Sequence, residues 1–232
     1  ESWLAGLEWM RLPFQGLHML EHIHYVRRSI GYCLGHYRGA LLRPRVFMAV
    51  AKAAFGNQVN FWRRTSRLRT ALDTDTRTLN LVLKETKAIA NYCAEQSQRY
   101  TSLSPSLINP SFGPVLYAIV RILHPEIVVE TGVGSGFSTT FLLSALAHND
   151  FGRLYSIDLL RPREQQIPEE KETGWLIPDN LKDRWEFISG DARQELPTLL
   201  DHIDKLDCFF HDSDHSYEYM SWEFGLVYPR LQ

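Results

Sequence analysis

The sequence predicts an α/β protein: a Rossmann-like, doubly wound and mostly parallel sheet preceded by a helical N-terminal extension. Three observations carry this prediction. After about residue 110, short apolar runs alternate with amphipathic stretches, a glycine-rich turn joins the first such run to the next helix, and residues 1–105 show no strand alternation. At 232 residues and 44% apolar content, the chain is long enough for one full domain plus the extension.

In the extension, a regular helix is expected over residues 75–98, where apolar side chains recur at helical spacing from Leu79 to Ala90. The Ser/Pro/Asn-rich stretch at 101–111 predicts a loop, so we place the domain boundary between residues 105 and 106, giving an extension at 1–105 and a sheet domain at 106–232.

The extension is basic and the rest of the chain acidic. Residues 1–70 hold eleven Lys and Arg against three acids, whereas residues 71–232 hold fourteen against twenty-four. Four arginines cluster beside Phe61 and Trp62 at residues 63–69. We interpret them as a solvated helix face that packs on the acidic domain. Docking on an anionic membrane surface or on a protein partner stays open, and nucleic acid is the less favoured partner.

The sheet domain is expected to open with a helix at 114–123, since Pro114 suits a first turn and Pro125 follows its end. Short apolar strands and amphipathic helices then alternate, which is typical of a parallel sheet covered on both faces. The expected strands are 127–130, 154–157, 185–188 and 206–210, and the expected helices are 137–147, 194–203 and 217–228. Between the second and third strands, a long polar stretch carries the apolar segment 174–178, which we expect to anchor it over the sheet edge.

The segment VVETGVGSGFS runs from the first strand into a helix through Gly132, Gly134 and Gly136. Alternate glycines permit a tight turn and let a ligand lie against bare backbone at the N-terminus of a helix. The spacing alone is a weak signal, but the strand before it and the helix after it are where a nucleotide-binding turn requires them.

Two carboxylates narrow the choice of ligand. Asp158 ends the second strand, where an acidic side chain can accept hydrogen bonds from both ribose hydroxyls of an adenosine. Glu130 precedes the glycines, where it would repel a pyrophosphate and attract an ammonium or sulfonium group. A nicotinamide-dependent oxidoreductase is therefore the less favoured function, because it also requires a glycine where this chain has Phe137.

Residues 211–218 read HDSDHSYE and follow the last expected strand, so they emerge at the carboxyl edge where ligands of such sheets bind. One interpretation is structural: Asp212, Ser213 and Asp214 form a turn and cap the helix that follows. The other is chemical, because this stretch gathers two aspartates and two histidines next to the glycine turn.

Glu130, the G-x-G-x-G turn, Asp158 and the G-D-A at residues 190–192 together resemble class I S-adenosylmethionine-dependent methyltransferases. The stretches GWLIPDNLKDRW and DCFFHDSDHSYE are more specific. They resemble the family that includes macrocin-type O-methyltransferases and sequences named cephalosporin hydroxylases. The resemblance spans residues 110–232, about half of the chain.

This resemblance implies a cofactor site and a mechanism. S-adenosylmethionine would lie on the turn, with its methionyl end near Glu130 and Gly132, its methionyl carboxylate on Ser138, its ribose on Asp158, and its adenine between Asp191 and Ala192. Asp212 would bind a divalent cation such as Mg²⁺, and His215, three residues on, would take the proton from an acceptor hydroxyl. Relatives complete the metal site with residues after the next strand, so we expect the C-terminal strands and the other metal ligands to be missing from this chain.

The predicted function is O-methylation of a small-molecule hydroxyl, assisted by a divalent metal. The alternative is a non-catalytic scaffold that keeps a partial methyltransferase fold. Three widely spaced cysteines, no candidate membrane span and no signal peptide predict a reducing, cytoplasmic location. Because the chain begins at Glu1, we expect it to be a piece of a longer protein or a processed form. The HMLEH pattern at 18–22 fits a zinc-peptidase motif, but no third ligand is identifiable, so we interpret it as packing or chance.

Overall fold

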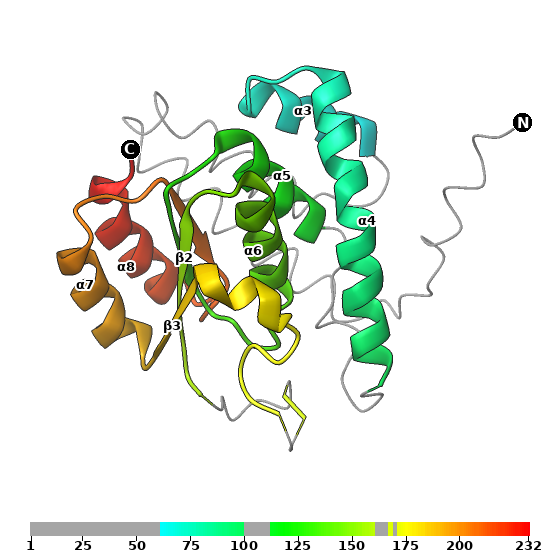
Figure 1. The fold of residues 1–232 in the computed structure, drawn as a ribbon. Helices are drawn as coiled ribbons and strands as arrows, with labels where there is room; N and C mark the ends of the chain where they lie inside the picture. The colour runs from blue at the N-terminus through cyan, green and yellow to red at the C-terminus, as the bar shows by residue number, and fades with distance from the viewer. Residues whose placement is uncertain (1–60, 100–111, 161–166, 169–170) are drawn as a thin grey trace, which may run out of the picture. The chain divides into compact units, whose positions relative to one another are not determined.

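Figure 1 shows the computed structural model of the protein, which describes residues 61–99, 112–160, 167–168 and 171–232. The predictions for residues 1–60, the HMLEH pattern among them, lie outside the described residues. The expected domain boundary between residues 105 and 106 also lies outside them. Within the described ranges, no helix is both long enough and apolar enough to cross a bilayer.

Two helices precede the sheet: α3, Phe61–Ala71, and α4, Thr76–Gln98. Asp75 caps α4 by accepting a hydrogen bond from the Thr78 amide at 2.9 Å, which satisfies one of the free N–H groups of the first turn. The buried side chains of α4 recur at helical spacing and lie on one face of the helix; they are Leu79, Val82, Thr86 and Cys93. The helix expected over residues 75–98 is confirmed.

Helix α4 is joined to the domain by a polar network as well as by apolar packing. The Tyr117 hydroxyl, on α5 (Gly113–Leu123), donates to Glu85 of α4 at 2.7 Å, and Arg121 Nε donates to the same carboxylate at 3.0 Å. The same hydroxyl lies 2.7 Å from Nδ1 of His148 on α6 (Phe137–Asn149). Three helices therefore meet at one tyrosine.

The sheet has four parallel strands in the order β3-β2-β1-β4. These are β1 Ile127–Thr131, β2 Arg153–Asp158, β3 Trp185–Ser189 and β4 Cys208–His211. In the register of the central strands, Val128 pairs with Leu154 on one side and with Cys208 on the other. The first strand in sequence is thus an inner strand, as the doubly wound prediction requires.

Helices cover both faces of the sheet, as Figure 1 shows: α5 and α6 lie on one side, and α7 (Ala192–His202) and α8 (Tyr217–Val227) on the other. Each face has its own buried cluster. The first joins α3, α4, α5 and α6 to the sheet through residues such as Leu79, Tyr117 and Phe141. The second joins α7 and α8 to it through residues such as Val129, Leu196 and Leu200. The predicted fold class is confirmed.

The last strand differs from its prediction. It was expected at residues 206–210, but β4 begins at Cys208 and ends at His211. Asp207 is not a strand residue, although its amide donates to the Ile127 carbonyl at 3.0 Å; its carboxylate accepts from the amides of Glu126 and Ile127, both at 2.9 Å. Leu206 pairs on the opposite side, where it forms an isolated parallel bridge with Leu231. His211 is therefore a strand residue rather than the first residue of a loop.

Candidate active site

The glycine turn lies between β1 and α6 and depends on backbone conformations that suit glycine. Gly132, Gly134 and Gly136 have φ angles of 86°, 52° and 87°. At Gly132, a Cβ would lie 2.3 Å from the carbonyl oxygen of Asp212, so the turn and the end of β4 are in direct backbone contact. At Gly136, an added Cβ would lie 2.8 Å from the Ile177 side chain, so this end of the turn is also closely packed.

Asp158 lies under the turn at the end of β2. Its Oδ2 accepts hydrogen bonds from the amides of Val133 and Gly134, both at 2.8 Å, and its Oδ1 accepts from the Leu159 amide at 2.7 Å. The carboxylate therefore fixes the turn. A carboxylate has about four lone-pair sites, so three donors leave capacity for a ligand hydroxyl. Contact between Asp158 and a ribose stays a prediction.

Glu130 is fully buried on the α6 face of the sheet. Its carboxylate accepts three hydroxyl hydrogen bonds, from Ser138 at 2.7 Å, Thr139 at 2.8 Å and Ser156 at 2.8 Å. Desolvation raises the pKa of Glu130 to about 7, although these three donors oppose the rise. Glu130 and Ser138 are thus bound to each other beneath the turn, and their contacts with a ligand stay predictions.

Asp191 and Ala192 begin the helix after β3. Asp191 is the N-cap of α7, and its Oδ1 accepts from the Arg193 amide at 2.8 Å, so the capping role that the sequence suggested is present. Ala192 is buried against the second cluster. A role for the two residues beside an adenine is compatible with their place at the carboxyl edge and stays a prediction.

Asp212 and His215 form a half-exposed pair directly after β4. His215 Nε2 lies 3.6 Å from Asp212 Oδ1, with exposed side-chain fractions of 46% and 38%. The neighbouring carboxylate of Asp212 raises the pKa of His215 by favouring its protonated form. Among the described residues, no group of three or more His, Cys, Asp or Glu side chains is arranged to hold a metal ion.

Helix α8 follows this pair. The sequence suggested that Asp212, Ser213 and Asp214 form a turn and cap this helix, but the N-cap is a different residue. The N-cap of α8 is Ser216, whose hydroxyl accepts from the Tyr219 amide at 3.4 Å. Asp214 supports the cap because its Oδ1 accepts from the Ser216 amide at 2.7 Å. Since Asp214 and Ser216 build the turn, the side chain of Asp212 is not used as a helix cap.

A second buried carboxylate, Glu223 of α8, was missed by the sequence analysis. It is fully buried, and it accepts from Thr131 Oγ1 at 3.1 Å, from Ser213 Oγ at 3.0 Å and from His211 Nδ1. The His211 side chain is only 5% exposed, and its Nε2 has no hydrogen-bond partner within the described residues. The only signal in the sequence was a lone glutamate on the buried face of an amphipathic helix.

The apolar segment 174–178, expected to anchor the long polar stretch over the sheet edge, lies against the glycine turn. The Gly174 amide donates to the carbonyl of Gly134 and the Leu176 amide to that of Ser135, both at 2.9 Å. Leu176 and Ile177 are buried in the first cluster. This segment therefore lies directly beside the glycine turn.

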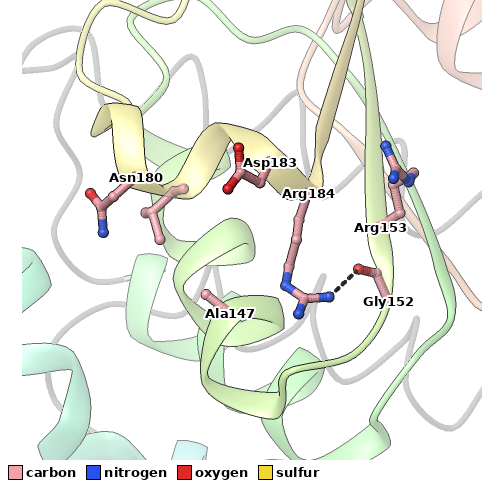
Figure 2. Close-up of a pocket in the computed structure, with 7 residues that line it drawn as sticks. Ala147, Gly152, Arg153, Asn180, Asp183 and Arg184 are labelled. Atoms are coloured by element: carbon pink, nitrogen blue, oxygen red, sulfur yellow. Dashed lines mark hydrogen bonds between the residues drawn. The ribbon is translucent and has the colours of Figure 1, made fainter.

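Hollows on the surface of the described residues include the following two. Figure 2 shows one of about 330 Å³ lined by seven residues, including Arg153, Asn180 and Arg184. Arg184 points to the Gly152 carbonyl, just before β2, so this hollow is at the amino end of the strands and away from the glycine turn. The other, of about 210 Å³, is lined by Arg193 and Trp222.

Comparison with known proteins shows which proteins this chain resembles in sequence. Residues 129–232 match the methyltransferase-domain family. A provisionally named O-methyltransferase from Mycobacterium sp. (strain KMS) is 31% identical over 121 residues, which are 52% of this chain and 51% of that protein. The corresponding protein of Mycolicibacterium smegmatis is also 31% identical, over 52% of this chain and 54% of its own length. The chain thus matches about half the length of these relatives.

Solved structures give lower similarity. The O-methyltransferase TomG from Streptomyces achromogenes, in complex with SAM, is 21% identical, covers 74% of this chain and 70% of its own, and has a TM-score of 0.43. The O-methyltransferase from Bacillus cereus, in complex with SAH, is 21% identical and has a TM-score of 0.41. The match covers 70% of this chain and 67% of that protein.

Proposed function

We propose that this protein, whose residues 129–232 match the methyltransferase-domain family, transfers a methyl group from S-adenosylmethionine to a hydroxyl of a small molecule. One observation supports this most directly: the backbone contact between Gly132 and Asp212. It puts the glycine turn, which suits a nucleoside cofactor, next to the Asp212–His215 pair, which suits proton removal from an acceptor.

The residues at the carboxyl edge fit the cofactor. Asp158 retains hydrogen-bonding capacity for the ribose, and Asp191 with Ala192 lies where the adenine would rest. Gly132, Gly134 and Gly136 present backbone to the methionyl end, with Glu130 and Ser138 beneath them. When bound, the cofactor supplies a methyl group on a positively charged sulfur.

His215 is proposed as the general base. It takes the proton from the acceptor hydroxyl while the oxygen attacks the methyl carbon in line; the carbon–oxygen bond forms as the carbon–sulfur bond breaks. Asp212 orients the imidazole and stabilises its protonated form, which agrees with the raised pKa of His215. Because Asp212 favours the protonated imidazole, the rate of methyl transfer is expected to rise with pH as His215 loses its proton.

The proposed Mg²⁺ ion is not supported by the described residues alone. Asp212 offers one hard oxygen ligand, but Mg²⁺ prefers octahedral coordination by several oxygens, and no cluster of three ligands lies within the described part of the chain. The mechanism above accordingly runs through His215. Metal dependence is a separate proposal that rests on the family resemblance.

The partners and location are also proposals. A small-molecule acceptor is proposed from the family, and an anionic membrane surface or protein partner from the basic residues 1–70. A reducing, cytoplasmic location is proposed from the widely spaced cysteines, two of which, Cys93 and Cys208, are free thiols.

The proposal is tested by incubating the protein with methyl-labelled S-adenosylmethionine and a panel of phenols, sugars and aliphatic alcohols, with Mg²⁺ and with a chelator. Transfer of label to a hydroxyl supports the proposed function, and its dependence on Mg²⁺ tests the metal separately. If the folded protein binds S-adenosylhomocysteine but labels nothing, the panel lacks the acceptor. If it does not bind that nucleoside, the scaffold alternative is favoured, a proposal that the basic residues 1–70 support.

A further inference from the structure

The Glu223 carboxylate accepts hydrogen bonds from the residues that precede and follow Asp212 in the sequence. His211 precedes Asp212 and reaches Glu223 through Nδ1, while Ser213 follows it and donates through its hydroxyl at 3.0 Å. The third donor, Thr131, immediately precedes Gly132 on the neighbouring strand and pairs with His211 in the sheet. One carboxylate therefore holds the two strand ends that meet at the proposed site.

Stability alone does not explain this arrangement. Burying a carboxylate costs free energy before its hydrogen bonds are counted, and an unpaired buried ring nitrogen adds to that cost. Glu223 is fully buried, and His211 Nε2 has no partner within the described residues. Apolar side chains at these two positions would avoid both costs, since buried ion pairs can be replaced by well-packed apolar groups without loss of stability.

The network also fixes the direction in which the pair emerges. The Asp212 amide donates to the Thr131 carbonyl at 2.8 Å, so the main chain at Asp212 continues the sheet while its side chain reaches solvent. The His211 ring meets the His215 ring edge to face, with 5.3 Å between centroids. Fixing His211 through Glu223 thus gives His215 a rigid surface to pack against.

We propose that Glu223 is a positioning residue: acting through His211 and Ser213, it holds the Asp212–His215 pair in place at the carboxyl edge. The positioning role is a property of the fold, and its use in catalysis rests on the proposed function. Gln at residue 223 would offer one acceptor oxygen where the carboxylate offers two, so it cannot serve all three donors in the same way.

The test compares Glu223→Gln with the matched variant Glu130→Gln, a carboxylate that is equally buried and also accepts three side-chain hydrogen bonds, but on the opposite face. The ring signals of His215, assigned with His215→Gln, are followed by NMR at fixed pH, and amide exchange is measured by mass spectrometry. In Glu223→Gln, the His215 signals are expected to shift or broaden, and exchange in residues 211–215 to rise about tenfold. In Glu130→Gln, both should stay as in the wild type.

The proposal is overturned if the His215 signals and the exchange of residues 211–215 do not change in Glu223→Gln, or if exchange rises equally across the whole sheet. Should that variant fail to fold, Ser213→Ala decides, because it removes one donor: a smaller change at the same residues supports the proposal, and none contradicts it. Calorimetry of the wild type with S-adenosylhomocysteine tests the proposed function independently. Failure to bind would leave the positioning result standing.

Discussion

Gly132 and Asp212 are in contact so close that a single added carbon on Gly132 would lie 2.3 Å from the Asp212 carbonyl oxygen. This contact brings the end of β4 against the turn that follows β1. It also keeps the proposed base, His215, near the turn, since only two residues lie between it and Asp212.

The first prediction concerns Gly132→Ala. The variant has both a steric clash and a positive φ of 86°, so the free energy of unfolding should fall by about 3 kcal/mol, in the range of strained or overpacked sites. Urea denaturation measures the change. The matched control is Gly225→Ala in α8, where a Cβ meets nothing within 4 Å and the added helix propensity should stabilise by about 0.5–1 kcal/mol. Equal effects at both glycines would refute the close contact.

The second prediction concerns pH and Glu130. Burial raises its pKa from 4.5 in the unfolded chain to about 7, so the folded protein holds this proton more tightly. Protonated Glu130 therefore contributes about 3 kcal/mol to the free energy of unfolding. This contribution is fully present below pH 4.5 and is lost as the pH rises to 7. Glu130→Gln should lack this dependence. Denaturation curves at pH 4.5 and 7 check it, and an unchanged slope in the variant would show that Glu130 titrates normally.

The third prediction concerns the attachment of α4. Tyr117→Phe removes the hydroxyl that joins Glu85 of α4 to His148 of α6, and with it a hydrogen bond to a charged carboxylate. The free energy of unfolding should fall by about 1–3 kcal/mol, while the affinity for S-adenosylhomocysteine stays the same. Tyr92→Phe is the control, since that hydroxyl makes no hydrogen bond with the described residues. A loss of affinity in Tyr117→Phe would mean that α4 also shapes the cofactor site.

The fourth prediction concerns the base. His215→Gln should lower the rate of methyl transfer by about 10²–10⁴-fold, the usual contribution of general-base catalysis, with nucleoside binding unchanged. His202→Gln, on the exposed end of α7, should leave the rate as it is. If His215→Gln retains full activity with any acceptor from the panel, another group removes the proton.

Much of the fold could be predicted because local signals and tertiary structure agree. The glycines at 132–136, Pro114 in the first turn of a helix and the apolar strand runs each favour one backbone conformation, and the structure adopts it. The start of β4 could not be predicted, because it depends on hydrogen bonds between Asp207 and residues about eighty positions away in the sequence, Glu126 and Ile127.

The site was predictable in part for the same reason. Asp158 and Asp212 follow strands, so their place at the carboxyl edge follows from the topology. Glu223 lies on a helix among apolar residues and shows its partners only when α8 packs on the ends of β1 and β4. Nothing local marks it, since the meaning of a buried carboxylate depends on donors from other elements.

The central claim is that the glycine turn with Asp158 forms a site for S-adenosylmethionine. Isothermal calorimetry of S-adenosylhomocysteine and of NAD, into the wild type and into Asp158→Asn, tests it most directly. We expect the homocysteine nucleoside to bind and NAD not to bind, with the nucleoside weakened by about 1.5–3 kcal/mol when the charge on Asp158 is removed. Tighter binding of NAD, or no binding of either ligand by the folded protein, would contradict the claim.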